Sequence, residues 1–129
     1  MAAAALDVLG LLDEITEYLP LDTFVASPGQ GCVAVECRDD DQELTEILAA
    51  IDHPATRRAV VVERAFLAEL GSGCSLPVGA HATDHTLTAF LGDASGTRHS
   101  IETVELPDDT DRAMTAGAEL ARSMHQRLQ

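Results

Sequence analysis

The stretch LPVGAHATDHTLTAFLGDASGTRHSIETVEL, residues 76–106, decides the fold. Runs rich in strand-forming residues divide it into three predicted strands, at residues 76–83, 86–91 and 98–106. Asp84-His85 joins the first two runs, and the five residues from Gly92 to Gly96 join the last two. Because connections this short link antiparallel neighbours, the stretch predicts an antiparallel meander.

Helices are predicted before and after the meander in the sequence. Apolar residues recur at helical spacing in residues 44–51, in residues 55–70 and from Ala113 to Leu128. The stripes comprise Leu44, Ile47, Leu48 and Ile51; Ala59, Val62, Phe66 and Leu70; and Ala113, Gly117, Leu120, Met124 and Leu128. Asp39-Asp-Asp41 suits the start of the first helix. Residues 39–129 are therefore predicted to form an α+β domain, a three-stranded antiparallel sheet packed with about three helices.

Residues 1–38 have a different pattern. We expect a helix over residues 2–18, which Gly10 divides into two short pieces if it interrupts the helix. Residues 23–26 and 32–37 are predicted strands, and the second is apolar on both faces, which is typical of the middle of a large sheet. We interpret residues 1–38 as the remnant of preceding domains, so the chain is expected to be cut from a longer one.

Composition excludes several classes of function. Apolar residues make up 46% of the 129 residues, which favours a folded core. The net charge is -14, with 22 acidic side chains against eight arginines, which argues against nucleic acid as a partner and indicates a solvated acidic surface. No apolar run approaches the roughly 20 residues that span a membrane, and no basic segment opens a signal peptide. We expect a cytoplasmic protein.

The chain has three cysteines, at positions 32, 37 and 74. Their spacing matches neither a disulfide framework nor a zinc site, and Cys32 and Cys37 would face opposite sides of a strand. We therefore expect no metal site and reduced thiols, as is usual in a cytoplasm.

Cys74 is the first candidate functional residue. Gly71-Ser-Gly73 ends the preceding helix, so Cys74 is expected on an exposed loop. A small buried thiol is the commonest alternative. A catalytic thiolate fits poorly, because the end of a helix disfavours negative charge and the nearest basic residue, Arg64, is ten positions away. A thiol that anchors a cofactor needs only to be accessible and to react once.

Two further clusters are candidate binding residues. Pro28-Gly-Gln-Gly31 is either a plain tight turn or a turn that presents backbone amides and the Gln30 side chain to a ligand. Arg57, Arg58 and Arg64 either bind carboxylates or pair on the surface with Glu63 and Glu69. For both clusters, the residue pattern alone leaves the two alternatives open.

Several motifs, taken together and in order, resemble the porphobilinogen deaminases, also called hydroxymethylbilane synthases. The main ones are PGQGCVAVECR at residues 28–38 and GCSLPVG at residues 73–79. The others are ALDVLGL at 5–11, His53-Pro54, Thr56-Arg57 and Glu63-Arg64-Ala65.

The resemblance implies a transferase of porphyrin, tetrapyrrole and heme biosynthesis. Members of the family join four porphobilinogen molecules into hydroxymethylbilane, with release of ammonia, on a covalent dipyrromethane cofactor. By this resemblance, Cys74 carries the cofactor as a thioether and Gly73 lies beside it, while Gln30 and Gly31 lie near cofactor and substrate. Residues 39–129 would be the domain that binds the dipyrromethane.

The chain also departs from the family pattern. Members are more than twice as long, and the catalytic aspartate and most of the carboxylate-binding arginines lie in the part that has no counterpart here. Val8 stands where an arginine is usual, and Cys32 where alanine is usual. No catalytic residue is therefore assigned, and the chain alone is expected to be inactive. Alternatives are a noncatalytic module that dimerises through residues 1–38, or one subunit of a split enzyme with a separate N-terminal partner.

Overall fold

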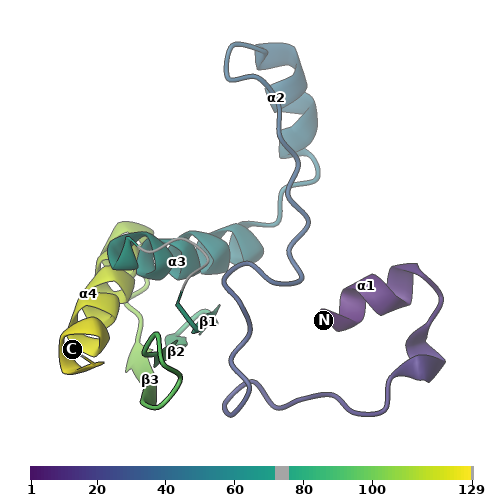
Figure 1. Ribbon diagram of the computed structural model, residues 1–129. Helices are drawn as coiled ribbons and strands as arrows, with labels where there is room; N and C mark the ends of the chain where they lie inside the picture. The colour runs from purple at the N-terminus through teal and green to yellow at the C-terminus, as the bar shows by residue number, and fades with distance from the viewer. Residues whose placement is uncertain (72–75, 129) are drawn as a thin grey trace.

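A computed structural model describes residues 1–71 and 76–128 (Figure 1). Gly73 and Cys74, two of the predicted site residues, lie outside the described residues. The elements are α1 (Ala3–Val8), the 3-10 helix η1 (Leu12–Glu14), α2 (Gln42–Ala49), α3 (Pro54–Leu70), β1 (Val78–Ala82), β2 (Thr86–Gly92), β3 (His99–Glu105) and α4 (Thr110–Leu128).

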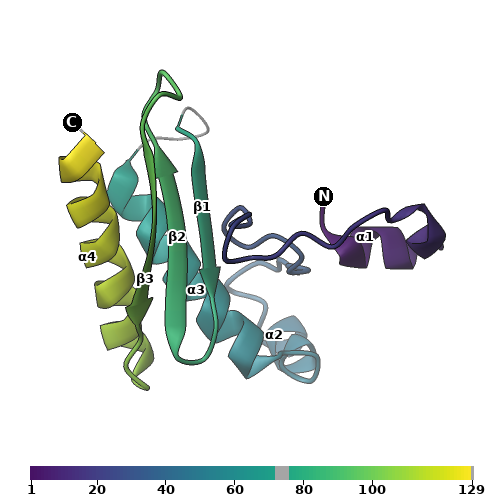
Figure 2. The same ribbon diagram turned by 90° about the horizontal axis from the view of Figure 1, so that it is seen from below.

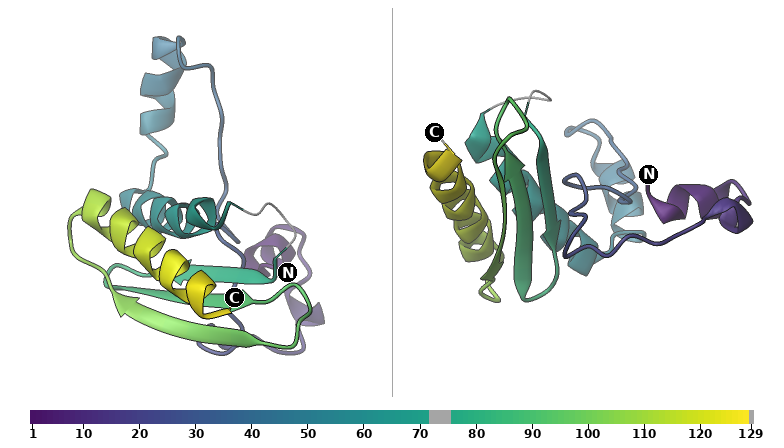
Figure 3. Two further views of the ribbon diagram at one scale, coloured as in Figure 1. Left: turned by 60° about the vertical axis from the view of Figure 1, so that its left-hand side comes forward. Right: turned by 60° about the horizontal axis from the view of Figure 1, so that its bottom comes forward.

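The three strands form one antiparallel sheet in the order β1-β2-β3. Ala89 of β2 lies opposite Ala80 of β1 and Glu102 of β3, which fixes the register across the sheet. Figure 3 shows α3 and α4 side by side over the same face of the sheet. The predicted α+β fold and the meander are confirmed.

The core lies between this face and the two helices. Its largest fully buried side chains are Phe66 and Val62 of α3, Leu87 and Leu91 of β2, and Met124 of α4. All of them lie in the predicted stripes or strands. The helix boundaries also agree with the sequence, since Asp41 caps α2 by accepting the Leu44 amide at 3.0 Å and Gly71, with φ of 60°, ends α3.

The predicted strands at residues 23–26 and 32–37 are wrong for this chain, because both segments have irregular backbone. Val33 is 88% exposed, whereas burial on both faces was expected. A strand forms only against a partner that takes up its backbone hydrogen bonds, and no strand of the described sheet pairs with residues 32–37. The predicted N-terminal helix divides into α1 and η1, with Gly10 (φ of 68°) between them.

The helix α2 stands away from the unit formed by α3, α4 and the sheet (Figure 1). Its predicted amphipathic pattern is present, but Ile47 is 60% exposed and Ile51, just past its end, is 68% exposed. The apolar face of α2 is therefore largely uncovered in this chain. No helix among the described residues is long and apolar enough to cross a membrane.

Candidate functional site

The site is built around the turn of residues 28–31, which passes beside β1 (Figure 2). Gln30 donates its backbone N–H to the Ser27 carbonyl at 2.9 Å, and Cys32 donates to the Gly29 carbonyl at 3.1 Å. Gly29 and Gly31 have φ values of 75° and 86°. Because side chains other than that of glycine disfavour such angles, the two glycines give the turn its shape.

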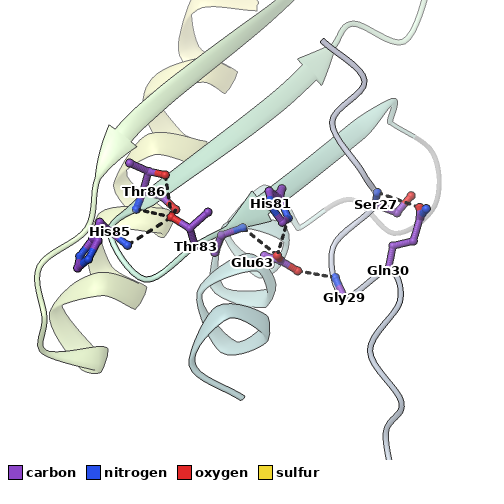
Figure 4. Close-up of polar contacts among 9 residues, drawn as sticks. Ser27, Gly29, Gln30, Glu63, His81, Thr83, His85 and Thr86 are labelled. Atoms are coloured by element: carbon purple, nitrogen blue, oxygen red, sulfur yellow. Dashed lines mark hydrogen bonds and ion pairs between the residues drawn. The ribbon is translucent and has the colours of Figure 1, made fainter. Parts of the chain in front are cut away.

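Glu63 of α3 connects this turn to the sheet. One carboxylate oxygen, Oε2, accepts the Gly29 N–H at 2.6 Å, and the other, Oε1, accepts the Ala82 N–H at 2.9 Å (Figure 4). The Nδ1 atom of His81 lies 3.9 Å from Oε1. Glu63 is only 6% exposed. The carboxylate is satisfied by hydrogen bonds, as burial of a charged group requires.

The outer edge of β1 is covered by the same segment. The Ala80 N–H donates to the Ala26 carbonyl at 2.8 Å, two residues from the Ala82 N–H that Glu63 accepts. Gly79 permits this approach, since a Cβ there would lie 2.7 Å from the Val25 carbonyl oxygen. Two N–H donors on this edge of the sheet therefore have acceptors. Ala80 donates to a backbone carbonyl, and Ala82 donates to a carboxylate.

Gln30 itself is exposed at the tip of the turn. Its Oε1 accepts the Ser27 N–H at 3.4 Å, and within the described residues its side-chain amide nitrogen and the Gly31 N–H have no acceptor. Both groups are donors, which suits a ligand that bears carboxylates. The structure brings Gln30 and Gly31 together but does not describe Cys74 or Gly73.

The three candidate arginines have different surroundings. Arg57 contacts Asp52 at 2.7 Å, and this hydrogen bond and charge raise the pKa of the guanidinium. Arg58 donates to the Pro107 carbonyl. Arg64 is exposed, with no polar partner among residues 1–71 and 76–128. Arg58 also has a buried Nη1 without a partner in the described part of the chain, so Arg64 is the exposed one of the three that could bind a carboxylate.

The surface pairing expected of Glu63 and Glu69 with these arginines is wrong. Glu69 pairs with Arg122 at 2.9 Å, and that hydrogen bond lowers the pKa of its carboxyl. Glu63 accepts backbone amides instead. The sequence did indicate burial of Glu63. Intervals of four, three and four residues separate Ala59, Glu63, Phe66 and Leu70, so Glu63 lies on the buried stripe of the helix.

A hollow of about 500 Å³ lies between residues 32–37 and the helices α2 and α3. Its lining is mostly apolar and includes Val33, Leu48 and Val60. The thiols of Cys32 and Cys37 are free, exposed and at its rim. In the described part of the chain, no cluster of three or more histidine, cysteine or acidic side chains suits a metal ion.

Two family profiles match the chain. The profile described as "Porphobilinogen deaminase, dipyromethane cofactor binding domain" matches residues 1–46, which include the turn. The profile described as "Porphobilinogen deaminase, C-terminal domain" matches residues 57–126, which include Glu63 and the whole meander. Together they cover most of the chain.

Curated relatives agree with the profiles. Porphobilinogen deaminase 1 of Streptomyces avermitilis is 42% identical over 96% of this chain and 42% of its own length. The Geobacter sulfurreducens porphobilinogen deaminase is 41% identical over 83% of this chain and 35% of its own length. That of Mycobacterium leprae is 54% identical over 64% of this chain and 26% of its own length. The chain spans less than half the length of these relatives, and it belongs to the porphobilinogen deaminase family.

Proposed function

We propose that this chain is the C-terminal portion of a porphobilinogen deaminase, the cytoplasmic transferase that polymerises four porphobilinogen molecules into hydroxymethylbilane. The observation that carries the proposal is the hydrogen bond between Glu63 and Gly29. It joins the turn of residues 28–31, which opens the family motif at residues 28–38, to Glu63, which opens the family motif Glu63-Arg64-Ala65 on α3. Family motifs far apart in sequence are therefore in contact through a buried carboxylate.

In this proposal Cys74 holds dipyrromethane as a thioether, beside Gly73. When bound, that group supplies the pyrrole end to which porphobilinogen units are added. The donors on the turn fit such a group, because the side-chain amide of Gln30 and the N–H of Gly31 are suited to its carboxylates. The match of the cofactor-binding profile to residues 1–46 supports this role for the turn.

The charged residues of the chain indicate which groups it supplies to the proposed enzyme and which it does not. We assign residues 39–129 as the domain that carries the cofactor and residues 1–38 as the end of the preceding region. Within the described residues, most arginines are paired with acidic groups or a carbonyl, and the net charge is -14. Such a surface cannot neutralise many substrate carboxylates, so we expect the rest of the family architecture to supply the basic and catalytic groups.

The uncovered apolar residues support a partner for residues 1–51. Val33, Ile47 and Ile51 are more than half exposed, and Val33 and Ile51 line the mostly apolar hollow. We propose that the N-terminal region of a porphobilinogen deaminase covers this surface, either in one longer polypeptide or as a separate subunit. A homodimer formed through residues 1–38 is the competing arrangement.

The experiment is an intact mass of the purified chain, alone and after co-expression with the N-terminal region of the Streptomyces avermitilis relative. We expect an added mass equal to dipyrromethane in the co-expressed chain, lost in Cys74→Ser, with hydroxymethylbilane formed only by the pair. Cys32→Ser is the matched control and should keep the added mass. Hydroxymethylbilane from the chain alone, or no adduct and no complex after co-expression, would refute the proposal. A dimer by light scattering would favour the competing arrangement.

A further inference from the structure

We propose that Glu63 is a positioning residue, which docks the turn of residues 28–31 onto β1 and so fixes where Gln30 is presented. The link from this docking to cofactor and substrate rests on the proposed function. The docking itself rests on geometry alone. Nothing in the pattern of family motifs requires that the turn be held by this side chain.

Two segments share the one carboxylate of Glu63. Gly29 lies 34 positions before Glu63 and Ala82 lies 19 positions after it, yet each donates its N–H to a different oxygen of the same group. Neither hydrogen bond belongs to a helix or a strand ladder. The carboxylate therefore holds together two pieces of backbone that the sheet does not connect.

Hydrogen bonds to an ionised carboxylate are shorter and about twice as strong as those between neutral groups, and the 2.6 Å contact with Gly29 is of this short kind. Both oxygens are used, so glutamine, with a single acceptor oxygen, can replace only one of the two bonds. Its amide nitrogen would face an N–H donor in the other. Glu63→Gln therefore breaks the connection with little change in side-chain volume.

A second contact holds the same segment against β1. The Ala80 N–H donates to the Ala26 carbonyl at 2.8 Å, and a Cβ on Gly79 would stand 2.7 Å from the Val25 carbonyl oxygen. Gly79→Ala must therefore displace residues 25–26 while leaving Glu63 intact. The docking can be disturbed from two independent sides.

A purely structural role for Glu63 predicts a different pattern of amide exchange. If the carboxylate only stabilises the core, Glu63→Gln speeds amide exchange throughout α3, α4 and the sheet. If it positions the turn, the effect is confined to Gly29 and its neighbours. Residue-specific amide exchange by NMR on the full chain separates these outcomes.

The experiment compares wild type, Glu63→Gln, Gly79→Ala and the control Glu69→Gln, which removes the same charge from the same helix. We expect exchange of the Gly29 amide to rise about tenfold or more in Glu63→Gln, with α4 amides unchanged. Gly79→Ala should also speed exchange of the Gly29 amide relative to wild type, because it displaces residues 25–26, and this variant tests the docking even if Glu63→Gln fails to fold. Glu69→Gln should leave Gly29 as in wild type.

Unchanged exchange of both amides that Glu63 accepts, those of Gly29 and Ala82, in Glu63→Gln, or equal acceleration through α4, overturns the positioning role. These amide-exchange measurements do not require bound dipyrromethane. If instead Gly29 is released but the co-expressed wild-type chain carries no dipyrromethane, the proposed function fails and the docking stands. The two ideas can therefore fail separately.

Discussion

Gly117 of α4 lies so close to Val62 of α3 that a Cβ at position 117 would stand 3.1 Å from the Val62 carbonyl oxygen. The two helices meet at this point over the buried face of the sheet, where Leu87 also contacts the position. Backbone on the facing helix is the obstacle, so relief requires α3 and α4 to move apart rather than a side chain to rotate.

Gly117→Ala should therefore destabilise the fold. Overpacking costs about 1–3 kcal/mol, and the better helix propensity of alanine returns up to about 1 kcal/mol. We expect the free energy of unfolding to fall by about 1 kcal/mol in urea denaturation. Thr115→Ala, on an exposed position of the same helix, is the control and should change little. An equally large loss in the control would mean that helix contact is not the cause.

Asp41→Ala should unfold α2 without weakening the rest of the fold. The Asp41 carboxylate accepts the Leu44 N–H at the start of this helix, and such caps contribute about 0.5–2 kcal/mol. Because α2 stands away from the α3–sheet–α4 unit, we expect lower helicity by circular dichroism at an unchanged midpoint for that unit. Asp40→Ala, one residue before the cap, should leave α2 folded.

Asp93 should make stability depend on acid pH. Burial raises the pKa of its carboxyl, but hydrogen bonds from the Arg98 backbone and from Thr97 and Ser95 outweigh this and lower the pKa to about 2. Since the folded value is below the ordinary 3.8, the carboxylate stabilises the fold above about pH 4, and this contribution is lost as pH falls toward 2.

Asp93→Asn should therefore show a shallower loss of stability between pH 4 and pH 2 than wild type, measured by thermal unfolding at each pH. Asp108→Asn, on the exposed loop before α4, is the matched control and should follow wild type. Parallel curves for Asp93→Asn and wild type would contradict the assignment.

Cys32 and Cys37 offer a direct test of the proposed N-terminal partner. Both thiols are exposed in this chain and lie at the rim of the apolar hollow. We expect a maleimide to modify both rapidly in the isolated chain and at least about tenfold more slowly in the co-expressed pair, because bound chain excludes the reagent. Peptide mass mapping assigns each site. Equal rates in a proven complex would place the partner elsewhere.

The sequence predicts the unit from α3 to α4 well, because its signals are local. Structure within a few residues is specified by each of three features: the two short turns, the glycine after α3 and the continuous apolar stripes on the helices. Residues 32–37 fail for the opposite reason, since a strand depends on a partner that residue pattern cannot supply. The exposed Val33 shows that apolar character alone does not produce pairing.

The candidate site was predictable only in part. Gln30 and Gly31 do lie on a tight turn, and this was readable from the glycines. The role of Glu63 was missed because an acidic residue on a helix usually faces solvent. Its position on the buried stripe indicates burial. Its partners, the Gly29 and Ala82 amides, are distant in sequence and are brought to it only by the fold.

The covered edge of β1 has a consequence for how the molecule behaves at high concentration. Exposed strand edges recruit strands from other molecules and start fibrils, and proteins protect them with charges or with covering segments. At β1 the Ala80 and Ala82 donors are already taken, by Ala26 and by Glu63. The contacts that hold the turn beside β1 therefore also occupy the donors of this edge, so a variant that releases the turn should associate more readily with other molecules through β1.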